Sequence, residues 1–439
     1  MSLPRYSEYK DSGVEWLGEV PGHWGVKRLK RNLQLLTEKT VRREHPVALE
    51  NIESWSGRFV ETETEFLGEG VAFEPGDILF GKLRPYLAKA YLAETAGEAV
   101  GDFHVMRPSK DVDGRFAQYQ ILNRDFITIV DGSTFGAKMP RASWDFLCNM
   151  ELATPPKTEQ QTIAAFLDRE TGKIDALIAE QRRLVELLAE KRQAVISHAV
   201  SKGLSPNAKM KYSGIEWLGE VPEHWEMKKI KQVSSLKGRL GWQGLKAEEY
   251  RAEGPFVVSS AHFDNFAIDW DVCPHVSTER YDLDNNIQLC EGDVLLMKDG
   301  AALGKLAYLA YLPDRACLNS HLLLFRPFLM NQRATYNPRF LFFLMRTDYF
   351  QEHINLHATG TTFLGISQEE IGNYRLVLPP LDEQVAIACY LDAETSKFDT
   401  LSVEANRAIE LLKERRSALI SAAVTGKLDV RGEQLLEIE

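Results

Sequence analysis

The stretch that decides the fold is Thr158–Val200, TEQQTIAAFLDRETGKIDALIAEQRRLVELLAEKRQAVISHAV. It contains no proline and a single glycine, and its apolar residues recur at alternating spacings of four and three. That spacing places them on one face of a helix and is typical of the seam of a coiled coil. At 1.5 Å per residue, such a helix is about 65 Å long, which is longer than a compact domain needs.

A second stretch of the same kind, Asp382–Thr425, lies 224 residues further along the chain. The two stretches align without a gap, so that Leu167-Asp168 matches Leu391-Asp392 and Lys191-Arg192 matches Arg415-Arg416. We expect two long helices that pair in antiparallel orientation as a coiled coil. The apolar positions expected on the two helices are Ile163, Leu167, Ile174, Leu177, Leu184, Leu188, Ile387, Leu391, Phe398, Leu401, Leu412 and Leu419.

The helices belong to an internal duplication of the whole chain. Ser12–Trp24 (SGVEWLGEVPGHW) and Ser213–Trp225 (SGIEWLGEVPEHW) are identical at eleven of thirteen positions. GDIL at residues 76–79 is matched by GDVL at residues 292–295, and the motif PP…EQ precedes each long helix. Insertions and deletions collect between these matched ends, so the two bodies differ in detail while the helices keep their length.

Each body mixes short β-type runs with helical segments. Runs such as Ala72–Phe80 and Asn286–Met297 are broken by Gly, Pro and Asp, and helices are expected at Gly114–Asn123 and Pro338–Asn355. The fold class predicted is therefore α+β: two similar α/β domains separated by two long antiparallel coiled-coil helices, with a pseudo-two-fold internal repeat.

Composition limits the class of protein. No apolar run approaches the ~20 residues of a membrane span and no signal peptide is evident, so we expect a cytoplasmic protein that does not bind membranes. The five cysteines are scattered and form no CxxC pair, which supports neither a zinc site nor a disulfide framework. The net charge of −11 counts mildly against a protein that grips nucleic acid alone.

No catalytic motif is recognisable. Gly300–Lys305 resembles a phosphate-binding loop but is one residue short and lacks the hydroxyl. The pairs Asp77…Lys82 and Asp293…Lys298 suggest a nuclease-like acid and base, but the spacing lacks the second acid that a metal site needs. We therefore expect no catalytic residue and no metal ligand in this chain.

The remaining candidates are binding residues on loops. Gly81–Lys89 (GKLRPYLAK) follows a predicted strand directly, and Arg and Lys there suit contacts to guanine and to phosphate. The segments 138–141, 238–244, 297–305 and 357–361 offer similar chemistry. The residues predicted to contact nucleic acid are Lys82, Arg84, Tyr86, Lys89, Lys138, Arg141, Arg239, Trp242, Gln243, Lys298, Asp299, Lys305 and Thr361.

Simpler interpretations exist for several of these residues. A charged loop after a strand is usually a solvated turn. Tryptophans of the repeated block (Trp16, Trp24, Trp217 and Trp225) are expected in the core, at a domain edge, rather than as stacking platforms. The neighbouring His23 and His224 are expected to cap or to form local hydrogen bonds.

Taken together, the WLGEVPxHW block, GDILFGKLRPY and GDVLLMKDG, the PP…EQ helix start, and the repeated stretches Phe166–Asp175 and Tyr390–Asp399 resemble the specificity subunit of Type I restriction–modification enzymes. The resemblance covers essentially the whole chain. It implies a non-catalytic subunit in which two target-recognition domains each read one half of an asymmetric bipartite DNA sequence. The implied domains are 1–157 and 204–381 for target recognition, 158–203 and 382–428 for the spacer helices, and 429–439 for a C-terminal tail without an assigned role.

The same resemblance implies the partners. The helices set the gap between the half-sites and dock two modification methyltransferase subunits, to which restriction subunits can add, and the DNA is double-stranded. S-adenosylmethionine, ATP and magnesium are expected on the partner subunits, and no cofactor on this chain. Two alternatives stay open: a coiled-coil scaffold that binds only proteins, and a stand-alone DNA enzyme with an unrecognised site.

Overall fold

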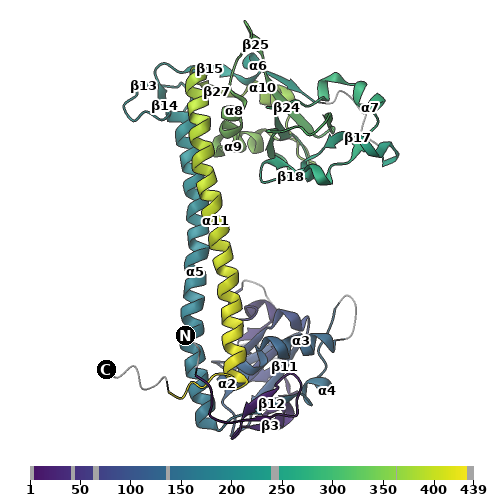
Figure 1. The fold of residues 1–439 in the computed structure, drawn as a ribbon, viewed down its shortest axis with the longest axis vertical. Coiled ribbons are helices and arrows are strands. Elements are labelled where there is room, and N and C mark those ends of the chain that lie inside the picture. Colours follow the sequence, from purple (N-terminus) through teal and green to yellow (C-terminus); the bar gives the residue numbers. More distant parts are fainter. Residues whose placement is uncertain are drawn as a thin grey trace. The chain divides into compact units, whose positions relative to one another are not determined.

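The computed structural model describes residues 4–40, 45–62, 69–134, 139–238, 247–361 and 363–432. The chain divides into two compact units, one formed by Met1–Arg183 with Ala405–Glu439 and the other by Leu184–Glu404. Two long helices are shared between the units: α5 (Lys157–Lys202) begins in the first and ends in the second, and α11 (Leu381–Val424) does the reverse (Figure 1). The acidic tail Glu433–Glu439 lies outside the described residues.

Local sequence explains where the two long helices begin and end. Proline pairs at residues 155–156 and 379–380 stand at their starts, where the missing N–H of proline has little cost. Gly203 and Gly426 follow their ends with φ of 78° and 76°, the left-handed conformation that closes a helix. With 46 and 44 residues, the helices are about 69 and 66 Å long. The predicted pair of long helices is confirmed.

The first unit contains two four-stranded sheets. The inner one has the order β4-β11-β8-β9 and is antiparallel throughout, whereas the order β5-β7-β10-β6 includes one parallel pair, β10 with β6. The strands are β1 (Tyr9–Asp11), β2 (Glu19–Pro21), β3 (Gly25–Arg28), β4 (Leu33–Leu36), β5 (Lys39–Thr40), β6 (Pro46–Val47), β7 (Gly70–Phe73), β8 (Ile78–Gly81), β9 (Ala90–Leu92), β10 (Gly97–Val100), β11 (Phe103–Pro108) and β12 (Glu151–Thr154). The short helices are α1 (Leu29–Asn32), α2 (Gly114–Ile121), α3 (Arg124–Gly132) and α4 (Trp144–Leu147).

The second unit repeats this plan. Its antiparallel sheet β16-β24-β21-β22 has the strand order of β4-β11-β8-β9, and β15 pairs with β27 as β3 pairs with β12. The strands are β13 (Met210–Tyr212), β14 (Glu220–Pro222), β15 (Glu226–Lys229), β16 (Ser234–Lys237), β17 (Tyr250–Val258), β18 (Phe263–Asp264), β19 (Ala267–Ile268), β20 (His275–Val276), β21 (Val294–Met297), β22 (Leu306–Tyr308), β23 (Ala316–Leu318), β24 (Leu322–Pro327), β25 (Leu329–Met330), β26 (Arg333–Ala334) and β27 (Arg375–Leu378). The short helices are α6 (Ile230–Val233), α7 (Thr278–Asp282), α8 (Pro338–Met345), α9 (Asp348–His357) and α10 (Gln368–Asn373). The predicted α+β class and internal repeat are confirmed.

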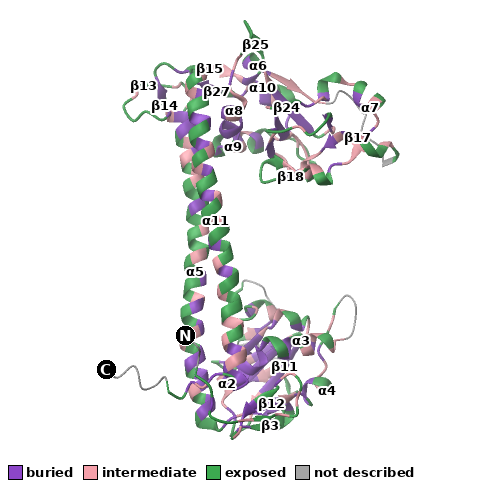
Figure 2. Ribbon diagram, in the orientation of Figure 1, coloured by how far each residue is buried: buried purple, intermediate pink, exposed green. Residues whose placement is uncertain are grey.

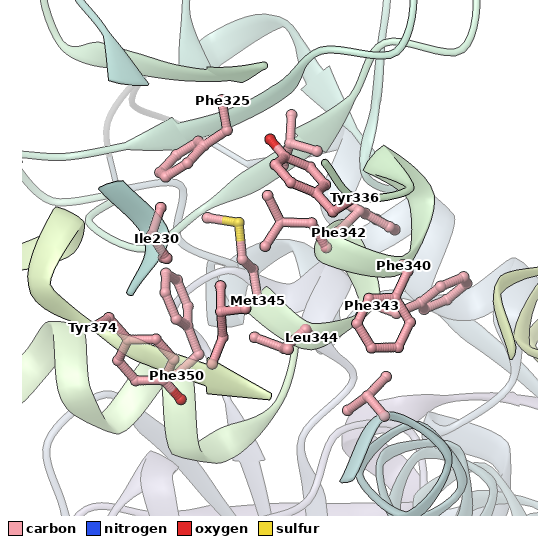
Figure 3. Packing of buried hydrophobic residues seen from close by; sticks show 14 of the residues in the cluster. Ile230, Phe325, Tyr336, Phe340, Phe342, Phe343, Leu344, Met345, Phe350 and Tyr374 are labelled. Carbon is pink, nitrogen blue, oxygen red and sulfur yellow. The ribbon is translucent and has the colours of Figure 1, made fainter. Parts of the chain in front are cut away.

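Each unit builds its core between the inner sheet, the short helices and a long helix. In the second unit, Phe340, Phe343 and Phe350 pack against strand β24 and helix α5 as one cluster (Figure 3). Trp24 and Trp225 are fully buried, as predicted for the repeated block. Trp217 departs from that prediction: it is 44% exposed and stacks on Tyr349 and Tyr374, with ring centroids 4.9 and 6.1 Å away.

The two long helices run antiparallel within each unit. In the first unit, Nε of Arg416 donates to Oδ1 of Asp175 over 2.9 Å, and Arg58 donates to the other oxygen over 2.8 Å. In the second unit, Arg192 forms an ion pair with Asp399. Both acids and both arginines are 224 positions apart, so the two ion pairs are equivalent in the repeat.

The buried seam of the helices differs in part from the predicted one. Leu177, Leu184 and Leu401 are 46%, 41% and 45% exposed, whereas Ile178 and Ile409 are buried together with Ile174. Figure 2 shows that buried, intermediate and exposed residues alternate along both long helices. The buried and half-buried positions of α5 follow residues 174, 178, 181, 185, 188 and 192. Two of these positions are Gln181 and Arg192, so the apolar pattern alone pointed to the neighbouring row of leucines.

The repeated His and Glu residues form contacts that sequence reasoning assigned wrongly. His23 Nε2 lies 2.8 Å from Oε2 of Glu159, and His224 Nε2 lies 2.7 Å from Oε2 of Glu383. These partners are 136 and 159 residues away, so the bonds are not local. They tie the repeated block to the first turn of each long helix.

The glutamine of each PP…EQ motif has an equivalent role. Gln160 accepts the backbone N–H of Asp113 over 2.8 Å and donates to the Pro155 carbonyl, and Gln384 makes the same two bonds to Asn337 and Pro379. The motif therefore fixes the start of a long helix to the helix that follows the inner sheet. Among the described residues, no helix is both long and apolar enough to cross a bilayer.

Candidate nucleic-acid interface

The loop after β8 holds the first group of predicted contact residues. Arg84 and Tyr86 are exposed, and Arg84 has a φ of 51°, a left-handed conformation that costs a non-glycine residue about 1–2 kcal/mol. Ala88, at the other end of the 3₁₀ turn Pro85–Leu87, is also left-handed, with a φ of 47°. Two such residues give this short loop a backbone shape that the surrounding structure has to hold in place.

Lys82 and Arg141, which are distant in sequence, converge on one carboxylate. Nη2 of Arg141 donates to Oδ2 of Asp102 over 2.9 Å, and Nζ of Lys82 lies 3.8 Å from Oδ1. Backbone bonds join the two segments: Arg84 N–H donates to the Pro140 carbonyl and Ala142 N–H donates to the Lys82 carbonyl, each over 2.8 Å. The result is a polar surface with two cations and one acid.

His104 lies behind this surface. Its ring is within 3.0 Å of the Ala142 carbonyl oxygen, to which a ring N–H donates. Burial lowers the pKa of His104, and the nearby Lys82 lowers it further. The neutral imidazole therefore supports the second segment without adding charge to the surface.

The loop after β21 occupies the same place in the second unit. Nζ of Lys298 donates to Oδ2 of Asp299 over 3.0 Å, and Nδ1 of His321 is paired with Oδ1 of the same carboxylate. Gly300 N–H donates to the Leu364 carbonyl over 2.8 Å, and Ile366 N–H donates to the Lys298 carbonyl over 2.9 Å. Gly300 and Gly304 are left-handed, with φ of 81° and 84°.

The two loops match bond for bond. The bonds of Gly300 and Ile366 are the counterparts of those of Arg84 and Ala142, and the bridge Asp299–Gly365 is the counterpart of the bridge Leu83–Arg141. The backbone frame is therefore the same in both units. The equivalent pairs that result are Lys82 with Lys298, Arg84 with Gly300, Asp102 with His321, Met139 with Phe363, and Arg141 with Gly365.

Two of the predicted lysines are held by backbone oxygens. Nζ of Lys89 donates to the Leu49 carbonyl over 2.7 Å, and Nζ of Lys305 donates to the carbonyls of Ser260 and Phe263, each over 3.0 Å. Thr361 is exposed on the segment that follows α9. Lys138, Arg239, Trp242 and Gln243 lie outside the described residues.

Sequence reasoning missed two exposed apolar side chains of this surface. Met139 is 53% exposed and Phe363 is 78% exposed, at equivalent positions beside the two lysine loops. Asp102 and His321 were missed as well. An alignment of the two halves at the 224-residue offset of the long helices pairs Met139 with Phe363. This alignment is the sequence signal that could have identified them.

The acid of the nuclease-like pair has a structural role in both units. Asp77 is buried and accepts two bonds of 2.8 Å from Arg107, and buried Asp293 accepts two bonds of 2.7 Å from Arg326. Burial raises the pKa of Asp293, and the bonds from Arg326 oppose that shift. These bidentate pairs join the residue before β8 to β11 and the residue before β21 to β24, at the strand ends opposite the two loops.

Comparisons with known proteins agree with this arrangement. Residues 222–411 match the family model described as the Type I restriction modification DNA specificity domain. The fold and the matched domain thus define a DNA specificity protein.

Similar proteins extend the match over the chain. The Type I restriction enzyme MjaVIII specificity subunit of Methanocaldococcus jannaschii is 22% identical over 430 residues, which are 94% of each chain. The EcoKI specificity subunit of Escherichia coli is 23% identical over 334 residues, 74% of this chain and 68% of that protein. The crystal structure of the HsdS subunit from Thermoanaerobacter tengcongensis has a TM-score of 0.53 at 19% identity, covering 93% of this chain and 98% of that chain.

A further solved structure, from work on complex assembly and conformational transition of a type I R-M system, gives a TM-score of 0.66 at 20% identity and covers 93% of this chain and 99% of that chain. The chain is thus similar to Type I restriction–modification specificity subunits over nearly its whole length, and its residues 222–411 match their DNA specificity domain. This similarity supports the predicted role in DNA target recognition.

Proposed function

We propose that each unit reads one half of an asymmetric, bipartite DNA target. The observation that carries this proposal is the pair of lysine loops, which share a backbone frame and differ in their side chains. Arg141 in the first unit offers a bidentate donor for guanine, whereas its counterpart in the second unit is Gly365. Different donors on one frame favour two different half-sites.

We further propose that the exposed apolar residues beside the loops add apolar contacts to the DNA. Met139 and Phe363 stand out from the surface at equivalent positions. Apolar side chains of this kind contact thymine methyl groups or insert between base steps. Phe363 is the larger and more exposed of the two, so it offers more apolar contact area.

The long helices serve as spacer and docking site in this proposal. Each helix belongs to both units. In this proposal, the length of the helices sets the separation between the two DNA half-sites that the units recognise. Exposed Leu177, Leu184, Leu401 and Leu411 give the helices an apolar outer surface. Charge-bearing segments 180–183 and 190–192 flank the leucines of α5. We infer that two methyltransferase subunits dock here and that restriction subunits join them.

The chemistry then belongs to the partners. S-adenosylmethionine, ATP and magnesium would bind to those subunits, and the acidic net charge of −11 is compatible with DNA binding because the partners share in holding the DNA. A cytoplasmic location remains our expectation for such a complex.

The test is the methylation motif of the reconstituted complex. Arg141→Ala is expected to relax one base position in one half-site, with a loss of discrimination of about 1–3 kcal/mol, because a bidentate contact is removed. The other half-site and the gap stay unchanged. Arg31→Ala removes an exposed arginine from α1 of the same unit and serves as the control. A motif that changes in both halves, or in neither, would contradict the assignment of the first loop as a reader.

A further inference from the structure

Helices α9 and α10 bring two histidines and a glutamate together in the second unit. His353 and His357 lie one turn apart on α9, and their ring centroids are 4.1 Å apart. Oε1 of Glu370, on α10, lies 3.9 Å from Nε2 of His353 and 3.8 Å from Nε2 of His357. Both distances are too long for hydrogen bonds, and the potential ligand atoms all lie within 4.8 Å of one another.

Hydrogen bonding leaves the Nε2 atom of His357 available. Nδ1–H of His357 donates to the carbonyl oxygen of His353 over 2.9 Å, which places the lone pair of the neutral ring on Nε2. Metal-bound histidines are commonly fixed in this way by a backbone carbonyl. Nε2 of His353 is buried and has no hydrogen-bond partner, and a bound water or ion is one way in which folded proteins satisfy such an atom.

We propose that His353, His357 and Glu370 bind a divalent transition-metal ion, with Zn²⁺ as the best match. Two imidazoles and a carboxylate are ligands that zinc accepts at about 2.0–2.2 Å in tetrahedral geometry. Ligand atoms of such a site are about 3.3–3.5 Å apart, so the carboxylate has to approach each ring by only about 0.5 Å. A water molecule or a further ligand takes the fourth position.

The first unit provides an internal comparison. The residues that precede α3 and α9, Asn123 and Thr347, cap these helices equivalently and are 224 positions apart. Ser143 and Ser367 cap α4 and α10 in the same relation. At that offset, the three ligands correspond to Ile129, Ser133 and Phe146. The fold is thus built without the ligands in the first unit, so their presence in the second is not a requirement of packing.

The position of the site suggests what the metal does. Residues 358–367 connect α9 to α10, and within them Leu364 and Ile366 are hydrogen-bonded to the loop of Lys298. Thr359 and Gly365 close this connection with two backbone bonds of 2.8 and 2.9 Å. A metal between α9 and α10 would join both ends of the connection and hold its shape. Metal binding itself does not depend on the proposed DNA contacts.

The test is Zn²⁺ binding to the purified full-length chain, measured by competition with a chromophoric chelator. We expect one Zn²⁺ per chain, and a loss of affinity of at least about 100-fold in His357→Gln and in Glu370→Gln, because ligand removal should exceed the effect of losing an outer partner. His45→Gln removes an exposed histidine outside the site and should bind normally. Circular dichroism of each variant shows whether the chain is folded.

Co²⁺ provides a second readout that does not rely on affinity. Co²⁺ bound by nitrogen and oxygen gives visible d–d bands without a thiolate charge-transfer band, which separates this site from the exposed Cys290 and Cys389. Zn²⁺ should also raise the thermal unfolding temperature of the unmodified chain but not that of Glu370→Gln. Stoichiometric binding that persists in both variants, a thiolate signature, or no binding at micromolar Zn²⁺ would overturn the proposal.

Discussion

Lengthening both long helices by one heptad should lengthen the gap of the DNA target and leave both half-sites unchanged. The insertions are LIAEQRR, a copy of residues 177–183, after Arg183 and LSVEANR, a copy of residues 401–407, after Arg407. Arg183 and Arg407 are equivalent at the 224-residue offset. Each insertion falls at or close to the boundary of the two units.

The expected magnitude follows from helix geometry. Seven residues add about 10.5 Å to each helix, which corresponds to about three base pairs at 3.4 Å each. A heptad also keeps the buried seam in phase, since an α-helix drifts by only about 20° per seven residues. The buried and half-buried positions 174, 178, 181, 185 and 188 are therefore expected to keep their facing partners on either side of the insertion.

The assay is sequencing of methylated bases in DNA modified by the reconstituted complex. The double insertion should give the original half-sites with a gap about three base pairs longer. An insertion in α5 alone is the control, because it shifts one helix against the other and should abolish modification. An unchanged gap in an active complex, or a changed half-site, would refute the spacer role of the helices.

Two further predictions concern stability, with urea unfolding of the isolated chain as the measurement. Arg416→Ala should cost about 3 kcal/mol, because Arg416 and Asp175 are largely buried, whereas Arg192→Ala should cost at most about 1 kcal/mol, since Asp399 of that equivalent pair is 44% exposed. Equal losses of unfolding free energy in the two variants would show that burial does not determine how much these ion pairs stabilise the fold. Trp24→Ala should cost about 3–5 kcal/mol, as expected for a fully buried aromatic side chain, and the half-exposed Trp217→Ala should cost clearly less. The reverse order would mean that the stack of Trp217 on Tyr349 contributes more than the core position of Trp24.

The repeated features of the sequence predicted the fold well. A gapless match of two long helices, a duplicated block and absent catalytic motifs were enough for the fold class and the family. These signals are strong because each occurs twice at nearly constant spacing. The seam of the helices was less accessible, because Gln181 and Arg192 occupy seam positions that a search for apolar residues passes over.

The candidate interface was predicted only in part. Lys82 and Arg141 were identified separately, but their meeting at Asp102 depends on the bridge between Leu83 and Arg141, which no local pattern reports. The same reason hid the metal candidate: His353 and His357 are a recognisable helical pair, yet Glu370 joins them only through tertiary packing. Contacts between segments that are distant in sequence are therefore the main features that the sequence did not predict.

The paired loops also suggest how one fold can serve two half-sites. Bidentate bonds from Arg107 to Asp77 and from Arg326 to Asp293 fix the same strands in both units, and both acids are buried at the strand ends opposite the loops. Side chains at the surface, such as Arg141 and its counterpart Gly365, contribute little to that frame. A substitution there changes what the loop offers to a base while the strands below keep their register. Because the two units have separate frames, a change in one half-site need not disturb the other.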